Sequence, residues 1–478
     1  MGRRTPLSAV KSADAPRRTR SSPSLDDHYR HLEQAWEVVD SPHYAPLVVA
    51  NGNADAPVHR WFYMKEAYSA QLVQRVLQDT GLAQKSRVRI LDPYCGSGTT
   101  GVSLAHAVTA GMPKAASFVG IESNPFLHLA GRAKMQAFAK PPADFPRTAG
   151  AVAALALRSD APQARAPTLS TFHRPEFVPR EHLDELLRLR AAIDTIGRNA
   201  DEVEVDLLLL CLGASVEPAT RLRRDGRALR HEPLKRPRPP LDEFLDRAAA
   251  IGEDLSAVHD GYKGNVIRGD ARTSDPFRGI RNVDLALFSP PYPNNIDYTE
   301  VYKLEAWLLG LIRSSGEFAD QRRQSVRSHS SLKFDDVYAY KTMHVAAEIE
   351  NLIAPVLGAV PPFDRYSEER KRVIRGYVDD LFSTLRHVRR CMNLGARLVY
   401  VVGNSMHGKL TAGDHYVIAS DLLIARLAEF AGFKVDRIEI ARRPQRRSRA
   451  AEYLRESVVF ATAAEYDSAG PGVGRVGG

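Results

Sequence analysis

Short apolar runs rich in β-branched residues alternate along the chain with longer segments in which apolar residues recur at helical spacing. Apolar runs of about four to eight residues are typical of buried strands, and apolar residues three or four positions apart are typical of one helix face. The alternation predicts an α/β fold with a mostly parallel sheet that helices cover on both faces. Seven strands are expected, at 87–92, 117–122, 265–269, 283–288, 397–403, 433–441 and 457–463.

The last two expected strands are separated by too few residues for a long helix. Strands joined without a helical crossover pair in antiparallel fashion. We therefore expect these two strands to form a hairpin at the edge of the sheet.

Two long segments, 139–262 and 301–390, interrupt the alternation of strands and helices. Long loops without structure of their own are uncommon inside compact domains, so we expect both segments to be helical inserts. The helical patterns within them lie at 180–196, 201–214, 241–258, 301–312 and 365–390.

The two ends of the chain differ from the rest in composition. Residues 1–25 are rich in Arg, Ser and Pro, and residues 467–478 are rich in Gly with few large apolar side chains. Such segments cannot bury enough apolar surface to offset the entropy of ordering, so we expect a disordered basic tail and a flexible C-terminal tail. Between the tails, the parts 26–138 and 263–466 are expected to form the sheet domain around the insert 139–262.

The composition is that of an ordinary globular protein, with 478 residues, 44% of them hydrophobic and 26% charged. The longest apolar run, 207–214, is far shorter than the roughly 18 residues that a membrane span needs, and no signal-peptide pattern follows the N-terminus. We therefore expect a cytoplasmic protein without a membrane partner. Its three cysteines (Cys95, Cys211, Cys391) are widely spaced, which indicates neither a disulfide framework nor a metal site.

Basic residues are concentrated in one part of the chain. The net charge is +9, and the segment 221–238 contains only Asp225 and Glu232 as acidic residues. Arginine and lysine supply most non-specific nucleic-acid affinity by neutralising phosphates, although such a cluster can also be a solvated surface. A second cluster of arginines lies at 442–449. We expect the first cluster to contact nucleic acid, through Arg221, Arg223, Arg224, Arg227 and Arg230.

A glycine-rich loop follows the first expected strand directly. Its sequence, Pro93-Tyr-Cys-Gly-Ser-Gly98, leads into an apolar helix. Glycines allow a sharp turn and close approach to a ligand, and a helix N-terminus offers free N–H groups. The pattern also occurs in dinucleotide-binding enzymes. The expected cofactor contacts here are Asp92, Pro93, Gly96, Gly98 and Thr99.

Acidic residues also end the second and third expected strands. Glu122 lies 24 positions after Gly98, where a carboxylate can accept hydrogen bonds from a ribose diol. Asn124 opens the next helix, and Asp270 ends the third strand. Because ligands of open α/β sheets bind beyond the carboxyl ends of the strands, we expect Glu122, Asn124 and Asp270 to bind the cofactor.

The fourth expected strand leads into Ser289-Pro290-Pro291-Tyr292. Two prolines fix the backbone and remove N–H donors, so the neighbouring carbonyl oxygens lack local partners. The side-chain oxygen of Ser289 and a main-chain carbonyl can together accept both hydrogens of an amino group, while Tyr292 can stack on a planar ring. This arrangement predicts a receptor for an unstacked base whose exocyclic amine is the nucleophile, with catalysis by positioning and electrostatics.

These motifs resemble those of a known family. Asp92-Pro-Tyr-Cys-Gly-Ser-Gly-Thr-Thr100 is similar to the D-P-F-x-G-S-G-T cofactor motif of DNA amino-methyltransferases of restriction–modification type, and Ser289-Pro-Pro-Tyr292 is similar to their S-P-P-Y catalytic motif. The segment 59–69, with Phe62 and Ser69, resembles the part of these enzymes that covers the cofactor. Here the cofactor motif precedes the catalytic one, whereas many S-P-P-Y enzymes have the reverse order.

The resemblance implies a class I, Rossmann-like methyltransferase fold with S-adenosylmethionine as cofactor. It also implies DNA as the substrate, methylation within a specific sequence, and a cognate restriction endonuclease as a partner. The S-P-P-Y form is similar to that of cytosine-N4 enzymes, whereas adenine-N6 enzymes more often have D-P-P-Y or N-P-P-Y. Either insert, 139–262 or 301–390, can supply target recognition.

Other functions fit parts of the pattern. Adenine-N6 methylation of DNA and guanine-N2 methylation of RNA use close variants of the catalytic motif, and a DNA-binding subunit without cofactor is the alternative that is not an enzyme. Cytosine-C5 chemistry is disfavoured because it needs a cysteine nucleophile after the fourth strand, whereas Cys95 lies in the glycine loop. A dehydrogenase is disfavoured because it has no use for Ser289-Pro-Pro-Tyr292.

Overall fold

The computed structural model describes residues 23–225, 228–255, 262–294, 296–331, 334–362, 366–408, 415–444 and 451–465. Residues 1–22 and the predicted C-terminal tail lie outside the described residues. Residues 23–25 were expected to belong to the disordered tail, but they begin helix α1 (Pro23–Glu33). The helix starts this early because Leu25 is buried, at 2% exposure.

The centre of the fold is a sheet with the strand order β1-β11-β12-β8-β7-β2-β3-β6. All seven predicted strands are present, with ends that differ from the predicted ones by a few residues. The strands of the sheet are β1 (Glu37–Asp40), β2 (Arg87–Asp92), β3 (Ala115–Glu122), β6 (Tyr262–Arg268), β7 (Val283–Phe288), β8 (Met392–Gly403), β11 (Phe433–Arg442) and β12 (Glu456–Ala463).

The predicted hairpin of the last two strands is present, but the prediction that it forms the sheet edge is wrong. Strand β12 pairs antiparallel with both β11 and β8, so it lies inside the sheet. The edge beyond β11 is occupied by an unpredicted eighth strand, β1, which pairs parallel with β11. Strand β1 has only four residues and is largely exposed, so it leaves no hydrophobic pattern in the sequence.

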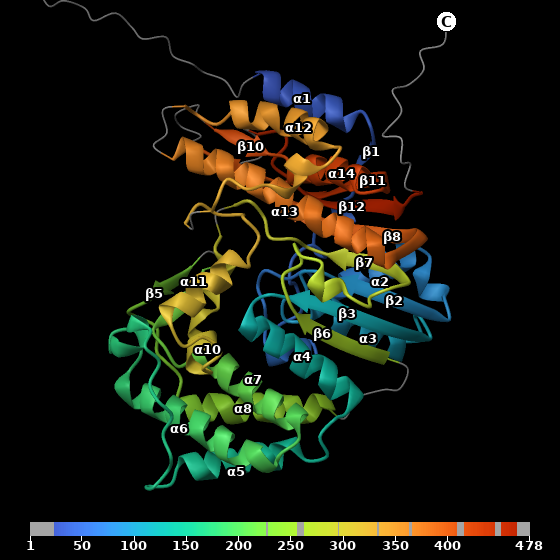
Figure 1. Ribbon diagram of the computed structural model, residues 1–478. Coiled ribbons are helices and arrows are strands. Elements are labelled where there is room, and N and C mark those ends of the chain that lie inside the picture. The colour runs from blue at the N-terminus through green and yellow to red at the C-terminus, as the bar shows by residue number, and fades with distance from the viewer. Residues whose placement is uncertain are drawn as a thin grey trace, which may run out of the picture.

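Helices cover both faces of the sheet (Figure 1). Residues of β8 alternate between two cores, with Val399 and Val401 on one side and Tyr400 on the other. One core contains side chains of α2 (Ala70–Asp79), α3 (Thr99–Thr109) and α4 (Pro125–Ala139). The other contains side chains of α1, α12 (Ala346–Gly358), α13 (Ser367–Cys391) and α14 (Ser420–Phe430). This two-sided burial is what the near-continuous apolar runs predicted.

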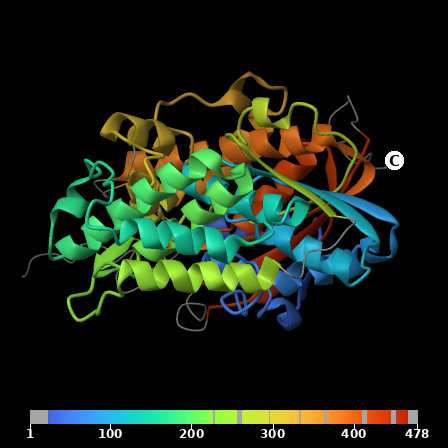
Figure 2. The same ribbon diagram turned by 90° about the horizontal axis from the view of Figure 1, so that it is seen from below.

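The insert 139–262 forms a helical layer beside the sheet domain. Figure 2 shows its helices lying side by side, and its α7 packs on α4 of the sheet domain. The three helices predicted here are confirmed, with ends shifted by a few residues. The insert contains α5 (Phe145–Ala156), α6 (Arg180–Ile196), α7 (Glu202–Val216), α8 (Pro240–Leu255) and the hairpin of β4 (Leu222–Arg224) and β5 (Leu229–His231).

The segment 301–390 is helical, as predicted, and lies near the carboxyl ends of the parallel strands. Besides α12 and α13, it contains α11 (Ser315–Arg323), which follows α9 (Tyr298–Val301) and α10 (Lys303–Leu308). A small antiparallel pair joins β9 (Ser405–His407) and β10 (Tyr416–Ile418). Short 3-10 helices lie at Pro42–Tyr44, His59–Trp61, Leu82–Gln84, Ser170–His173, Gly197–Asn199, Asp275–Phe277 and Ala339–Thr342. Among the helices described, none is both long and apolar enough to cross a membrane.

Arg224 of the basic segment ties the two inserts together instead of facing solvent. Its guanidinium is 2.7 Å from Glu217 and forms a second ion pair with Glu305 of α10, whose side chain is fully buried. It also lies over the rings of Phe62 and Tyr302. The sequence expectation of a phosphate contact at Arg224 is therefore not supported by its position, because protein carboxylates already neutralise its charge.

The Arg224→Ala variant should lose about 3–5 kcal/mol of unfolding free energy, because Glu305 would remain buried without its cation. Arg223→Ala is the matched control, since Arg223 is 68% exposed and 3.6 Å from Glu232. Its loss should be at most about 1 kcal/mol. Chemical denaturation of the wild-type protein and the two variants measures the difference in unfolding free energy. Equal losses in both variants would contradict a structural role for the Arg224 pair.

Candidate active site

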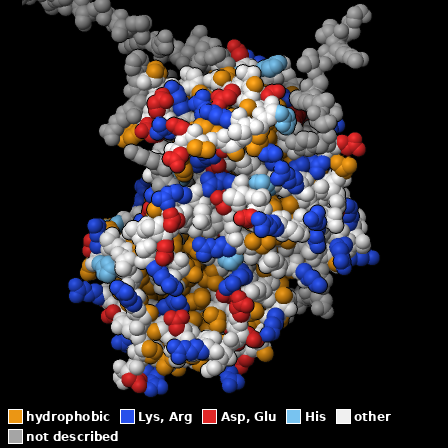
Figure 3. Space-filling model, in the orientation of Figure 1, with side chains coloured by type: hydrophobic (Ala, Val, Ile, Leu, Met, Phe, Trp, Pro, Cys, Tyr) orange, Lys and Arg blue, Asp and Glu red, His pale blue; other side chains and the backbone are white. Residues whose placement is uncertain are grey.

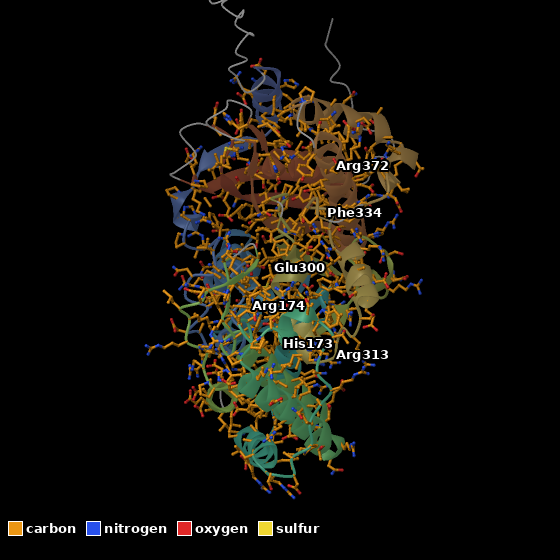
Figure 4. The ribbon with its side chains drawn as sticks, turned by 90° about the vertical axis from the view of Figure 1, so that its left-hand side faces the viewer. His173, Arg174, Glu300, Arg313, Phe334 and Arg372 are labelled. Atoms are coloured by element: carbon orange, nitrogen blue, oxygen red, sulfur yellow. The ribbon has the colours of Figure 1, made fainter. Side chains whose placement is uncertain are left out.

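A cavity of about 290 Å³ lies at the carboxyl ends of β2, β3, β6 and β7. These strand ends lie on the left in Figure 1, the side that faces the viewer in Figure 4. The cavity joins the predicted cofactor and catalytic residues in one space. Of the predicted residues, those that line it are Pro93, Gly96, Glu122, Asn124, Asp270, Ser289, Pro290, Pro291 and Tyr292.

The glycine loop turns from β2 into α3 through two residues with positive φ. Gly96 has φ +54° and Gly98, at the helix N-cap, has φ +87°. A Cβ on Gly96 would lie 2.7 Å from the sulfur of Met64. Only glycine therefore allows both this turn and this close packing. Met64 also lines the cavity, so this contact fixes one side of the predicted cofactor region.

Glu122 joins the loop to the start of α4. Its carboxylate accepts hydrogen bonds from the backbone N–H of Gly96 at 2.9 Å and of Asn124 at 2.7 Å. Asn124 in turn caps α4, accepting from the N–H groups of Phe126 and Leu127. Burial raises the pKa of Glu122 to about 7, although its backbone hydrogen bonds oppose the shift. The carboxylate thus lies in the cavity wall with a protonation state that changes near neutral pH.

Five predicted cofactor residues are not in the cavity wall, namely Asp92, Gly98, Thr99, Phe62 and Ser69. Asp92 is buried below the loop, where it accepts from the Thr100 hydroxyl and from the Tyr94 N–H at 3.0 Å. Phe62 packs edge-on against the Phe126 ring in the core. Ser69 caps α2. These positions indicate support of the loop and of the neighbouring helices rather than direct contact with a ligand.

Tyr292 is held by three other strands of the sheet. Its hydroxyl donates to Glu456 of β12 at 3.0 Å, and Glu456 pairs with Arg442 of β11 at 2.6 Å. A Cβ on Gly403 of β8 would lie 2.7 Å from the Tyr292 ring, so only glycine leaves room for it. The Ser289 hydroxyl is 3.4 Å from that of Tyr292. The ring therefore has a fixed orientation beside the serine.

Several cavity residues were not predicted from the sequence, namely Glu66, Tyr298, Ser325, Ser328, His329 and Glu456. They come from the segment before α2, from α9 and the segment after α11, and from β12. Apart from the family resemblance of segment 59–69, no short motif marks them. Arg442 belongs to the second arginine cluster of the sequence, and it is paired with Glu456 in the cavity wall. Arg446, Arg447 and Arg449 lie outside the described residues.

The fold and the site together define a class I, Rossmann-like methyltransferase. Seven strands of the sheet run in one direction, and β12 alone runs against them. Three features meet at the carboxyl ends of the parallel strands. They are the glycine loop, the acidic residue that ends the second predicted strand, and the Ser289–Tyr292 turn. In the parts of the chain that the structure describes, no cluster of three or more metal-ligating side chains is present.

Comparison with known proteins gives the same class. No family model matches the chain. The chain is 25% identical over 454 residues to the Type II methyltransferase M.BsoBI of Geobacillus stearothermophilus, a match that covers 86% of this chain and 84% of the relative. It is 23% identical over 449 residues to the Type II methyltransferase M.AvaI of Nostoc sp., with 82% of each chain covered.

Among solved structures, the rRNA methyltransferase aviRa of Streptomyces viridochromogenes matches with a TM-score of 0.29 and 12% identity, covering 85% of this chain and 89% of that one. The names of the two sequence relatives confirm the prediction of a methyltransferase, for which S-adenosylmethionine is the predicted cofactor.

Cofactor affinity should weaken as the pH falls through about 7, because Glu122 must be ionised to accept hydrogen bonds from the ribose hydroxyls. Calorimetric titration with S-adenosylhomocysteine across this range measures the effect. Glu122→Gln should bind more weakly at high pH and lose the dependence on pH. Burial also raises the pKa of Asp92 to about 7, so Asp92 is the competing source of a pH dependence of cofactor binding. A Glu122→Gln protein that keeps the full pH dependence would assign it to Asp92 and contradict the role of Glu122.

Proposed function

We propose that the protein transfers the methyl group of S-adenosylmethionine to the N4 amine of cytosine within a specific DNA sequence. The observation that carries the proposal is the single cavity shared by Glu122 and Gly96 at one end and Ser289 to Tyr292 at the other. Methyl transfer requires the sulfonium and the amine in line and in contact, and a shared cavity provides that proximity.

The residues around the glycine loop suit the cofactor. Glu122 accepts the ribose hydroxyls, Gly96 allows the close approach, and Asn124 lies at the N-terminus of α4. Bound there, S-adenosylmethionine supplies an activated methyl group on a sulfonium. Glu122, when ionised, favours a ligand with positive charge, whereas Arg272 already neutralises Asp270.

The Ser289–Tyr292 turn suits an exocyclic amine. The Ser289 hydroxyl oxygen and the Pro290 carbonyl accept the two amine hydrogens, which favours a pyramidal nitrogen with its lone pair directed at the methyl group. Tyr292 stacks on the ring, and its hydrogen bond to Glu456 fixes the stacking plane. A serine hydroxyl is too weak a base to remove the amine proton, so Ser289 acts by positioning.

The choice of cytosine in DNA rests on the serine form of the motif and on the relatives. The S-P-P-Y motif resembles that of cytosine-N4 enzymes, and the sequence relatives are named Type II methyltransferases. Their names support DNA as the substrate, whereas a cognate restriction endonuclease stays a prediction from the motifs.

The proposed DNA path runs over the face of the molecule at the carboxyl ends of the parallel strands. Figure 4 shows Arg174 of the first insert, Arg313 of the second and Arg372 of α13 on that face, with Glu300 between them. Figure 3, which views the adjoining face in the orientation of Figure 1, shows Lys and Arg side chains interspersed with Asp and Glu over both the sheet domain and the insert. Within the basic segment, Arg221, Arg223 and Arg230 remain the proposed phosphate contacts. Arg223 and Arg230 pair with Glu232 and Asp225, but both arginines are exposed, whereas Arg224 is held by the buried Glu305. Arg227 lies outside the described residues.

Ser289→Ala and Tyr292→Ala should both lower the rate of labelled methyl transfer to DNA while leaving cofactor affinity unchanged. Ser289→Ala removes one amine acceptor, and Tyr292→Ala removes stacking worth roughly 1–3 kcal/mol. Filter assays of transfer and calorimetry with S-adenosylhomocysteine give the two measurements. Parallel assays with RNA test the alternative substrate. Transfer at the wild-type rate in either variant would reject this role for the turn.

Charge reversal at Arg221, Arg223 and Arg230 should weaken binding to all DNA sequences about equally. It should also reduce the slope of log K against log salt by about 0.9 for each lost phosphate contact. Arg158→Glu is a suitable control, because Arg158 is an exposed arginine of the same insert but outside the basic segment. An unchanged salt slope together with reduced affinity would show that the segment acts through folding.

A further inference from the structure

One wall of the cavity comes from the segment 324–329, which follows α11. Gln324, Ser325, Val326, Ser328 and His329 of this segment all line the cavity. The segment thus lines the same cavity as the Ser289–Tyr292 turn. Among these five lining residues, His329 has the one titratable side chain.

His329 is buried, and only one of its two ring nitrogens has a hydrogen-bond partner in the described structure. The residue is 2% exposed, and its Nδ1 lies 2.8 Å from the Ser331 hydroxyl. Its Nε2 has no hydrogen-bond partner among the residues that the structure describes. A buried ring nitrogen without a partner is costly, so a ligand atom that satisfies it is favoured.

The carboxylate of Asp297 lies beside this free nitrogen. Asp297 Oδ2 is 3.7 Å from His329 Nε2, close enough for an ion pair if the ring gains a proton. Asp297 follows Tyr292 by five positions, and it is fixed by Arg322 at 2.9 Å and by the N–H of Thr299 at 3.1 Å. The pair lies at the cavity wall, because His329 lines the cavity and so do Ile296 and Tyr298 on either side of Asp297.

We propose that His329 accepts, at Nε2, the proton that the target amine loses on methylation, with Asp297 stabilising the imidazolium. This inference rests on the proposed amine methylation. The new bond joins the amine nitrogen to the methyl carbon while the sulfur–methyl bond breaks and its electron pair returns to sulfur. The methylated nitrogen carries the positive charge until its N–H bond breaks and the proton passes to Nε2. On product release the proton goes to solvent.

The protonation state of His329 suits this role. Burial lowers its pKa from the ordinary 6.5, while Asp297 and Glu300 oppose the shift and Arg322 adds to it. The ring is therefore neutral near pH 7 and can accept a proton. A protonated, methylated exocyclic amine is a far stronger acid than imidazolium, so the transfer is downhill.

The other acidic groups of the cavity are less suitable acceptors. Glu456 already pairs with Arg442, and Asp270 pairs with Arg272 at 2.7 Å. Glu66 has one buried carboxylate oxygen without a hydrogen-bond partner in the described structure. However, Glu66 belongs to the same segment as Met64, which packs on Gly96 of the predicted cofactor loop. Glu66 is therefore the rival that an experiment must separate from His329.

The test is the rate of methyl transfer in a single turnover, measured from about pH 5 to about pH 8 on a DNA duplex that the wild-type protein methylates. S-adenosylmethionine is saturating at every pH, so that the expected change in cofactor affinity with Glu122 does not affect the rate. The wild-type rate should fall as the pH drops below about 6.5, because protonated His329 cannot accept a proton. His329→Gln keeps a polar side chain but cannot carry the proton. It should be slower by about 100-fold or more and lose this inflection.

Controls separate the possible outcomes. His344→Gln, at an exposed position, should behave as wild type, and calorimetry with S-adenosylhomocysteine should show that His329→Gln retains its cofactor site. The inference would be overturned if His329→Gln transferred methyl groups at the wild-type rate, or if it were slower but kept the inflection. It would also be overturned if Glu66→Gln lost the inflection and His329→Gln did not. If the wild-type protein transfers no methyl group to DNA, the proposed function fails and this inference fails with it.

Discussion

Parallel pairing of β2, β3, β6 and β7 is the constraint on which the site depends. Because these strands are paired in parallel, their carboxyl ends lie at the same edge of the sheet. The glycine loop, Glu122, Asp270 and Ser289 each follow or end one of these strands, so they meet although up to about 190 residues separate them. A change in register along any of the pairs would separate the predicted cofactor residues from the catalytic turn.

The remaining parts of the cavity are fixed by long-range polar contacts rather than by the sheet alone. Tyr292 depends on Glu456 of β12 and on the close approach of Gly403 of β8, which join two further strands to the turn. The segment 324–329 supplies a further part of the cavity wall. Arg224 connects the two inserts through Glu305, so their mutual position and the shape of the opening are linked.

Local patterns were enough to predict the seven strands, the helices of the inserts and the residues that follow strand ends, because these depend on short stretches of sequence. They could not predict β1, whose four residues are largely exposed. Nor could they assign Arg224, because its partner Glu305 lies 81 positions away. His329 and Glu456 belong to the cavity only through tertiary packing. Asp92 was expected in the cavity because it precedes the loop, but hydrogen bonds with Thr100 and Tyr94 hold it below the loop.

The central claim is that the amine held by Ser289 and Pro290 is N4 of cytosine in DNA. Mass spectrometry of nucleosides, after incubation of duplex DNA with the protein and isotope-labelled S-adenosylmethionine, tests it most directly. The account predicts labelled N4-methyldeoxycytidine as the product, absent when Ser289→Ala or Tyr292→Ala replaces the wild-type protein at the same incubation time. Labelled N6-methyldeoxyadenosine, or label that enters RNA and not DNA, would contradict it.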